Sequence, residues 1–234
     1  MKSKKYAAVI FDLFGTLINN LSFREYESVL RQMASVLSVP SDDFVRWWSD
    51  TSHERNTGII PSPEPIIRHI CQKLGVPVED ARVRLAARIR FDYTRRSLVP
   101  RPDAITVLSH LKAAGYKTGL ISDCSSEVPK IWPDTLFARF IDMAVFSCSV
   151  GLRKPDPRIY KLVTSRLAVE PQDCLYIGDG SSQELTGAAR VGMHPVLLRI
   201  DAESTEPHLV NREKWDGPAI LSLVDVLTLC ELRS

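Results

Sequence analysis

Five short apolar runs constrain the fold of this chain more than any other feature. An unbroken apolar run of about four to eight residues is typical of a strand that is buried on both faces. The runs are Tyr6–Phe11, Lys117–Ser122, Met143–Ser147, Cys174–Gly178 and Pro195–Ile200. Patterns of helical period lie between them, at Asp103–Ala114, Pro157–Leu167 and Glu184–Val191. This alternation predicts an α/β fold, a Rossmann-like doubly wound parallel sheet with helices on both faces.

The stretch from Asn19 to Leu98 departs from the alternation, because all of it has helical character. Helices are predicted over Phe23–Leu37, Ser41–Asp50, Glu64–Leu74 and Val78–Ser97. Parallel sheets bind ligands at the carboxyl ends of their strands, so an insert after the first strand lies over the binding edge. We therefore expect a core domain of residues 1–18 and 99–234 and an inserted α-helical lid of residues 19–98.

Composition excludes several classes of partner. The chain has 234 residues, with 30 Lys plus Arg against 28 Asp plus Glu, so its charge favours neither nucleic acid nor an anionic membrane. No apolar stretch reaches the about 20 residues of a membrane span, and no secretory cleavage site follows the basic amino terminus. Five scattered cysteines without paired spacing are expected to be reduced and mostly buried. We expect a cytoplasmic protein with a small-molecule substrate, and the sequence leaves its oligomeric state open.

Polar residues follow the predicted strands at the points where these end. Asp12, Ser122 and Asp179 end or directly follow their strands, and Lys154 follows by way of a loop. Each residue alone is equally well explained as a helix cap, a turn residue or a surface charge. Because parallel strands bring their carboxyl ends to one edge, we expect these side chains to meet. Two carboxylates, a hydroxyl and an ammonium at one edge predict a site for an anion and a metal.

Four segments at these strand ends resemble, in order, the four motifs of the haloacid dehalogenase superfamily. They are Phe11–Leu17 (FDLFGTL), Leu120–Asp123 (LISD), Gly151–Pro157 (GLRKPDP) with Ile159 and Tyr160, and Tyr176–Glu184 (YIGDGSSQE) with Gly187 and Ala188. Together they cover nearly the whole predicted core, whereas a lone Asp-x-x-Gly-Thr would be weak support. The resemblance implies a hydrolase with an α/β core and a helical cap domain between the first two motifs, which matches residues 19–98.

The resemblance also implies that Asp12 is a covalent nucleophile, which attacks the electrophile through one oxygen before water hydrolyses the intermediate. Thr16, Ser122 and Lys154 would act with it as catalytic residues. The Lys154 ammonium suits the oxygens of a phosphoryl group and offsets the like charges of neighbouring carboxylates. The expected substrate-binding residues are Ser122, Asp123 and Lys154.

A pair of carboxylates at one sheet edge also requires a cation. In the superfamily that cation is Mg²⁺, held by the nucleophile, by the backbone carbonyl two residues later and by the aspartate of the fourth motif. These positions are Asp12, Phe14 and Asp179 here, and Glu184 would act through a water molecule. The implied cofactor is therefore Mg²⁺.

Phe14 departs from most phosphatases of the superfamily, which carry a second aspartate there to protonate the leaving alkoxide. Phenylalanine transfers no proton, and losing a positioned acid typically costs about 10²–10⁴-fold in rate. Halide leaves without a proton, and haloacid dehalogenases of the superfamily carry an aromatic residue at this position. Those dehalogenases lack the metal-binding aspartate, however, whereas Asp179 and Glu184 are of the magnesium-binding kind.

Three hypotheses follow from this disagreement. The leading one is Mg²⁺-dependent hydrolysis of a small phosphorylated metabolite through a phosphoaspartate, because a carboxylate beside Asp12 without a metal is electrostatically costly. The second is a metal-independent 2-haloacid dehalogenase that works through an alkyl-aspartate ester. The third is a catalytically idle binding or regulatory protein on the same scaffold. The sequence leaves open the physiological substrate and the group that replaces the missing acid at Phe14.

Several side chains of the predicted lid are candidates for contact with substrate. The candidates to replace the missing acid are His53, His69, Arg24, Arg46 and Tyr93, and the sequence singles out none of them. The pair Trp47 and Trp48 is expected to pack inside the lid. A solvated face is expected for the arginine-rich helix, with Arg82, Arg84, Arg88, Arg90, Arg95 and Arg96.

Overall fold

Six parallel strands form one sheet in the computed structural model, which describes residues 4–19, 22–199 and 212–231. They are β1 (Ala8–Phe11), β2 (Lys117–Ser122), β3 (Met143–Phe146), β4 (Cys174–Gly178), β5 (His194–Leu198) and β6 (Ala219–Ile220). Their order across the sheet is β3-β2-β1-β4-β5-β6, which places β1 between β2 and β4. The predicted Rossmann-like parallel sheet is confirmed.

The apolar runs locate most strand ends closely. The prediction gives β2 and β4 their observed ends, whereas β1 begins at Ala8 rather than Tyr6 and β3 ends at Phe146 rather than Ser147. The predicted end of the fifth strand, Ile200, lies outside the described residues. The strand β6 was not predicted, because two residues make no recognisable run.

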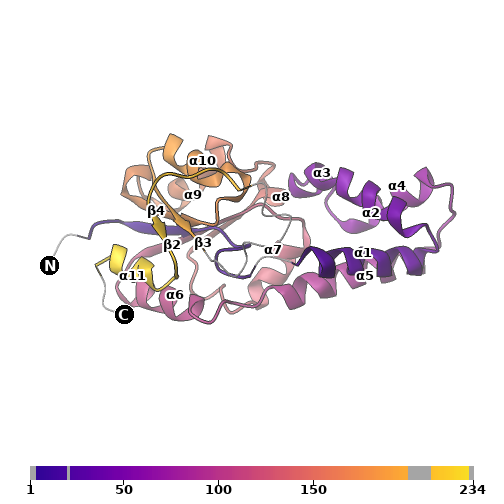
Figure 1. Cartoon of the computed structure of the whole chain (residues 1–234), viewed down its shortest axis with the longest axis horizontal. Coiled ribbons are helices and arrows are strands. Elements are labelled where there is room, and N and C mark those ends of the chain that lie inside the picture. Colours follow the sequence, from indigo (N-terminus) through magenta and orange to yellow (C-terminus); the bar gives the residue numbers. More distant parts are fainter. Residues whose placement is uncertain (1–3, 20–21, 200–211, 232–234) are drawn as a thin grey trace.

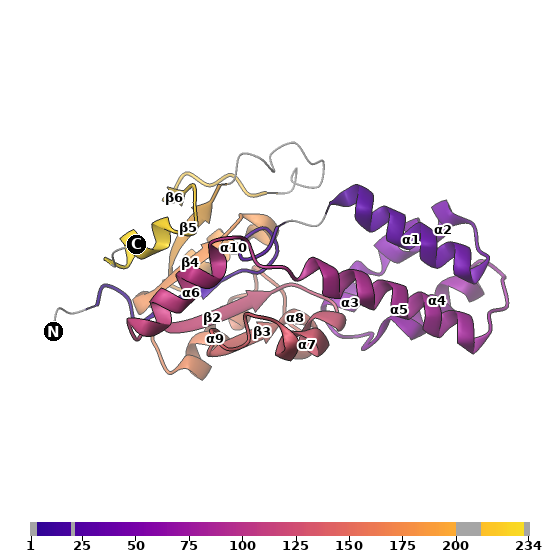
Figure 2. The ribbon, with the colours of Figure 1, turned by 90° about the horizontal axis from the view of Figure 1, so that it is seen from below.

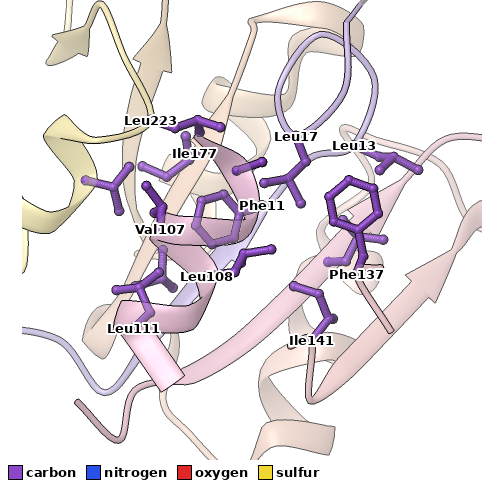
Figure 3. Close-up of a cluster of buried hydrophobic side chains, with 14 of the residues drawn as sticks. Phe11, Leu13, Leu17, Val107, Leu108, Leu111, Phe137, Ile141, Ile177 and Leu223 are labelled. Carbon is purple, nitrogen blue, oxygen red and sulfur yellow. The ribbon is translucent and has the colours of Figure 1, made fainter. Parts of the chain in front are cut away.

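One face of the sheet packs against α6 (Ala104–Ala113) and α11 (Asp225–Leu229). Val9 and Phe11 of β1 belong to the hydrophobic cluster that these helices complete. Figure 3 shows the Phe11 ring among the side chains that α6 turns toward the sheet. All of β1 is buried, so the first polar side chain of this segment is that of Asp12, where the strand ends.

The opposite face packs against α9 (Pro157–Leu167) and α10 (Glu184–Arg190). Ala8 and Ile10 belong to this second cluster, as the alternation of side chains along a strand requires. Figure 1 shows α9 and α10 on one side of the strands and α6 and α11 on the other. A sheet covered on both faces leaves its carboxyl edge as the place where polar side chains gather.

The connections at the carboxyl edge contain short helices. The helix α7 (Glu127–Ile131) follows β2, and α8 (Ser147–Val150) follows β3. Short 3₁₀ helices lie at Trp132–Asp134 and Ser181–Gln183, and a further one, Pro171–Asp173, directly precedes β4 at the opposite edge. The helix α9 begins at Pro157, and Asp156 caps it by accepting the backbone N–H of Arg158 (2.9 Å). This cap fixes the end of the loop that carries Lys154.

Residues 22–98, all of which the structure describes, contain five helices with a hydrophobic cluster of their own. They are α1 (Phe23–Leu37), α2 (Ser41–Asp50), α3 (Ser52–Asn56), α4 (Pro63–Lys73) and α5 (Asp80–Ser97). We call this segment the helical bundle. Figures 1 and 2 show that it extends beyond the carboxyl ends of the strands, with α1 lying along α5. The four predicted helices are present, and the limits of a cap domain at residues 19 and 98 stay a prediction.

The two adjacent tryptophans of α2 pack within the helical bundle, as expected. Trp48 is fully buried, and its Nε1–H donates to the hydroxyl of Tyr26 (2.9 Å). Its ring stacks on that of Phe44, with centroids 5.9 Å apart. Trp47 is partly buried against the same cluster. The pair therefore holds α2 against α1.

Candidate active site

The site begins where β1 ends, at Asp12. The backbone N–H of Asp12 donates to the Ile177 carbonyl of β4 (2.9 Å), which holds the residue at the sheet edge. Gly15 turns the chain at a φ of 83°, a conformation that favours glycine. The Arg101 guanidinium donates to the carbonyls of Gly15 and Thr16 (3.0 Å each). The loop after Asp12 is therefore fixed by its own turn and by a residue that follows the helical bundle.

Lys154 is the direct partner of Asp12. Its Nζ lies 2.5 Å from Oδ1 of Asp12 and 2.5 Å from Oε2 of Glu184, and its side chain is buried. Its backbone N–H donates to Oδ1 of Asp123 (3.1 Å). Burial opposes the charge, yet the carboxylates of Asp12 and Glu184 hold the pKa of Lys154 well above its usual value. The charged ammonium therefore bridges two carboxylates.

Asp179 and Glu184 complete a cluster of three buried carboxylates with Asp12. One oxygen atom of each lies within 4.8 Å of the other two. Asp179 directly follows β4 and accepts hydrogen bonds from the Ser181 N–H (3.0 Å) and the Arg212 guanidinium (3.1 Å). The cluster thus forms because β1 and β4 are neighbours in the sheet.

The carboxylate oxygens of the cluster differ in the number of hydrogen bonds that they accept. Both oxygens of Glu184 are engaged: Oε2 accepts from Lys154 and from the Tyr176 hydroxyl (2.9 Å), and Oε1 accepts from the Gly180 N–H (3.0 Å). Oδ2 of Asp12 is buried and accepts no hydrogen bond from any residue that the structure describes. Asp12 therefore keeps one oxygen free for a ligand or for reaction, whereas Glu184 is held in place.

Repulsion within the cluster alters its titration. Burial and the nearby charge of Asp179 raise the pKa of Asp12 to about 6, although Lys154 opposes the shift. Burial and the charge of Asp12 likewise raise the pKa of Glu184 well above its usual value. A cation bound among the carboxylates would lower both pKa values. The electrostatics of the site therefore favour cation binding.

The cluster fits a hard divalent cation such as Mg²⁺. Carboxylate oxygens are the ligands that Mg²⁺ prefers, and each can accept more than one partner, so Oδ1 of Asp12 could hold the ion beside Lys154 while Oδ2 stays free. Asp12 and Asp179 are the residues expected to hold the ion directly; both oxygens of Asp179 and both of Glu184 already accept hydrogen bonds, so their contact with the ion stays a prediction. The expected ligand from the backbone carbonyl of Phe14 stays a prediction.

Two predicted hydroxyls lie at the same edge. Ser122 ends β2, which pairs with β1, and Thr16 lies in the loop after β1; both are fully buried. Neither hydroxyl has a hydrogen-bond partner within the described parts of the chain. A buried hydroxyl without a partner is costly, so both mark positions for the oxygen atoms of a ligand. Asp123, next to Ser122, forms an ion pair with Arg153 (3.5 Å) and so holds its loop.

A cavity of about 330 Å³ lies between this edge and the helical bundle. Phe14 and Asp123 line it from the side of the sheet. Arg55 of α3 and Arg90 of α5 line it from the helical bundle. Its size suits a small metabolite. Phe14, two residues after Asp12, is thus part of the cavity wall.

The sequence from residue 6 to residue 192 matches the family model of haloacid dehalogenase-like hydrolases. The match covers most of the chain and includes Asp12, Lys154, Asp179 and Glu184. The chain belongs to the haloacid dehalogenase-like hydrolases. The predicted superfamily and the prediction of an enzyme, a hydrolase, are therefore confirmed. The roles of the individual residues of this hydrolase stay predictions.

Relatives of this hydrolase catalyse two different reactions. A glyceraldehyde 3-phosphate phosphatase of Methanopyrus kandleri is 30% identical over 133 residues, which cover 56% of this chain and 56% of that protein. An (S)-2-haloacid dehalogenase of Pseudomonas putida is 24% identical over 194 residues, 79% of this chain and 81% of that one. The crystal structure of a HAD phosphatase from Thermococcus onnurineus has a TM-score of 0.65 and 20% identity, over 95% of this chain and 96% of that one. The chain spans about half the length of the phosphatases it matches.

The family implies that this hydrolase acts on a small-molecule substrate. The cavity between the sheet edge and the helical bundle has a matching size. None of the described helices combines the length and the apolar character that a bilayer span requires.

The predicted lid residues of this hydrolase lie away from the cavity. Four of them, His53, His69, Arg24 and Arg46, are exposed. Tyr93 is buried and lines a second pocket beside α1, not the cavity at the sheet edge. None of these five side chains lines the cavity at the sheet edge. The structure therefore brings none of them to the predicted site.

Two arginines of the cavity wall were not predicted as site residues. Of the six arginines on α5, five are exposed as expected, but the expectation is wrong for Arg90, which is 7% exposed. Arg90 shares its side of the helix with the buried residues Val83, Ala87 and Thr94, so the helical period could have identified it. Arg55 lies in a helix of five residues, which is too short to show such a pattern.

The five cysteines of this hydrolase are free thiols, as expected, and four of them are buried. Cys124 lines the cavity. Burial raises the pKa of the Cys124 thiol well above its usual value, so the reactive thiolate is disfavoured there. Cys124 therefore contributes to the cavity as a small packing residue.

Proposed function

We propose that this chain hydrolyses a small phosphorylated metabolite through a phosphoaspartate on Asp12, with Mg²⁺ as its cofactor. The observation that carries the proposal is the free, buried Oδ2 of Asp12 within a cluster of three carboxylates. In an attack on an alkyl carbon, Asp179 and Glu184 would repel the nucleophile without benefit. In phosphoryl transfer the same cluster suits a cation, and bound Mg²⁺ would neutralise charge on the phosphoryl group.

Lys154 selects the oxygen that attacks. Because the ammonium donates to Oδ1 of Asp12, Oδ2 remains as the nucleophilic oxygen. Oδ2 forms a bond to phosphorus while the bond from phosphorus to the leaving oxygen breaks, and the leaving group departs with the electron pair. The hydroxyls of Ser122 and Thr16 donate to phosphoryl oxygens, which gives them the partners they otherwise lack within the described residues. Water then attacks phosphorus, the bond to Oδ2 breaks, and phosphate leaves with Asp12 restored.

Phe14 restricts the leaving group. Its ring supplies no proton at the position of the usual acid, and the loose transition state of phosphoryl transfer needs least assistance when the leaving group is a stable anion. We therefore propose that acyl, enol or aryl phosphates react faster than simple alkyl phosphates. The helical bundle would belong to a cap domain that consists of residues 19–98. This domain would close the cavity from the side opposite the core domain, which consists of residues 1–18 and 99–234.

An aryl phosphate assay tests the proposal. With 4-nitrophenyl phosphate, we expect turnover that requires Mg²⁺ and falls by at least about 10³-fold in Asp12→Asn. Asp134→Asn, an exposed position of the same residue type, serves as the matched control and should keep wild-type turnover. In a single turnover in isotopically labelled water, the label should enter phosphate and not the Asp12 side chain, because water attacks phosphorus. Turnover that is indifferent to a chelator contradicts the proposal.

A 2-haloacid dehalogenase is the second candidate, favoured by the apolar ring of Phe14 in the cavity wall. Halide leaves without a proton, so this reaction needs no acid at that position. Here Oδ2 of Asp12 would displace halide from carbon, and water would then attack the carboxyl carbon of the ester. The label from water would therefore enter Asp12. Halide release from (S)-2-chloropropionate that persists in a chelator supports this reaction, and turnover that disappears in Asp12→Asn rules out an idle binding protein.

A further inference from the structure

Two nearly buried arginines form part of the cavity wall on the side of the helical bundle. Arg55 and Arg90 are each 7% exposed, and they come from α3 and α5. Phe14 and Asp123 line the opposite side, next to the loop of the nucleophile. A substrate that reacts at Asp12 and fills the cavity would therefore place its leaving group toward the two guanidinium groups.

The neighbours of Arg90 favour its charge but do not complete its hydrogen bonds. Burial opposes the charge, yet Tyr26, Glu127 and Tyr93 raise the pKa of Arg90. Its Nη1 donates to the Thr94 hydroxyl, and its Nε lies 3.7 Å from Oε1 of the buried Glu127. That separation is too long for a hydrogen bond, and the buried Nε has no hydrogen-bond partner within the described residues. The guanidinium also lies over the ring of Tyr26, 5.2 Å from its centroid. A buried donor without a full partner, in a side chain that lines a cavity, points to an acceptor on the ligand.

Arg55 has no carboxylate partner at ion-pair distance among the residues that the structure describes. Its Nη1 donates to the Trp48 carbonyl and to the Thr51 hydroxyl (2.6 Å), and its guanidinium lies 4.5 Å from the centroid of the Trp48 ring. These neutral partners position the cation without neutralising it. Burial and the charge of Arg90 lower the pKa of Arg55, although Tyr26 and Glu127 oppose the shift.

The carboxylates near the cavity do not neutralise both arginines. Glu127 pairs with Arg90 and also acts on Arg55, so one carboxylate faces two guanidinium groups. Asp123 accepts the Lys154 N–H through Oδ1, and its Oδ2 lies 3.5 Å from Arg153 without a hydrogen-bond partner among the described residues. A buried cation without an anion is costly, and a ligand anion would relieve that cost on binding. The planar guanidinium matches carboxylate and phosphate groups, to which it donates two parallel hydrogen bonds.

We propose that Arg55 and Arg90 bind a second anionic group of the substrate, a carboxylate or a phosphate, that belongs to the leaving group. The inference rests on the proposed phosphatase function and narrows its substrate to a phosphate ester or anhydride with such a group. A cavity of about 330 Å³ limits that substrate to a small metabolite. Glyceraldehyde 3-phosphate, whose leaving group is uncharged, is then a poor substrate of this chain.

Two isosteric aryl phosphates test the inference. We compare kcat/KM for 3-carboxyphenyl phosphate and 3-carbamoylphenyl phosphate, which differ in charge but hardly in shape. Charge-assisted hydrogen bonds predict a preference of about 10- to 100-fold for the carboxylate in the wild type. The preference should fall to near one in Arg55→Met and survive in part in Arg55→Lys. Arg84→Met, which removes an exposed arginine of α5, should leave it unchanged.

The outcomes separate this inference from the proposed function. Equal kcat/KM values for the two esters, with turnover still dependent on Asp12, overturn the anion site and leave the phosphatase intact. Absence of turnover for both esters overturns the phosphatase. In that case, or if Arg55→Met does not fold, calorimetric titration of the wild type with the two corresponding phosphonates decides the inference. Tighter binding of the carboxylate form supports it, and equal affinity refutes it.

Discussion

Replacing Lys154 with methionine tests the electrostatics of the carboxylate cluster. Methionine keeps an unbranched apolar chain, so the change is mainly the loss of the ammonium group. In the wild type this group lies 2.5 Å from Oδ1 of Asp12 and 2.5 Å from Oε2 of Glu184. Both oxygens lose a charged donor in the variant while they remain buried. We expect Lys154→Met to fold less stably, because an uncompensated buried charge is strongly unfavourable.

The size of the loss follows from this burial. Removing one partner of a buried ion pair costs about 3–5 kcal/mol. For a chain of this size, that corresponds to a fall in Tm of about 6–20 °C. The loss depends on pH, because the pKa of Asp12 is raised from 3.8 to about 6 in the folded protein and would rise further without Lys154. A carboxyl with a raised pKa opposes folding only as the pH rises above its unfolded value. The deficit relative to the wild type should therefore be small below about pH 6, where Asp12 is protonated in both folded proteins, and grow as the pH rises above 6 toward the higher pKa of the variant.

Urea denaturation followed by tryptophan fluorescence measures the deficit at about pH 8 and about pH 5. Lys112→Met is the matched control, because the Lys112 ammonium pairs with Asp142 at a half-exposed position. That pair should contribute less than about 1 kcal/mol. Adding Asp12→Asn to Lys154→Met should restore part of the lost stability. Equal small losses in the two lysine variants, or a deficit that does not shrink at acid pH, would refute the reasoning.

Three further predictions test other parts of the structure. Phe14→Asp should restore a proton donor and raise the rate for alkyl relative to aryl phosphates by about 10²-fold or more; an unchanged ratio of kcat/KM values contradicts the role given to this position. Gly178→Ala would place a Cβ atom 2.2 Å from Oε1 of Glu184, so we expect a loss of about 1–3 kcal/mol in urea denaturation and weaker Mg²⁺ binding in calorimetry. Trp48→Ala should cost about 3–5 kcal/mol and Trp47→Ala clearly less, since only Trp48 is fully buried; equal losses would argue against the packing described for α2.

The sheet was predictable because its strands are buried on both faces. Such strands appear as unbroken apolar runs, and the helices between them have a regular period. A helix between two strands predicts that the strands run parallel. The same logic predicted that Asp12, Lys154 and Asp179 would meet, and they do at the edge formed by β1 and β4. The fold and the grouping of these residues could be predicted from the sequence, because both depend on the order of the strands and helices and not on the geometry of side chains.

The cavity could not be predicted in the same way, because it is made by segments that meet only in three dimensions. Arg55 and Arg90 are 35 residues apart and lie on different helices, and their importance comes from burial rather than from spacing. An arginine on a charged helix is indistinguishable in sequence from its solvated neighbours unless its position in the helical period is examined. Whether Oδ2 of Asp12 is free likewise depends on which of the two oxygens Lys154 contacts. Only the three-dimensional structure shows this contact.

The absence of an acid at Phe14 and the presence of Arg55 and Arg90 both favour a substrate whose leaving group is an anion. Without a proton donor, the leaving group must depart as an anion, and its rate depends on how well that anion is stabilised. Two nearly buried cations attract negative charge more strongly than they would in solvent. They would hold the distal anion of the leaving group in the ground state and also favour the charge that develops on its oxygen. The cavity would thus replace proton transfer with electrostatic stabilisation, which reconciles a phosphatase-like carboxylate cluster with an aromatic residue where an aspartate usually acts.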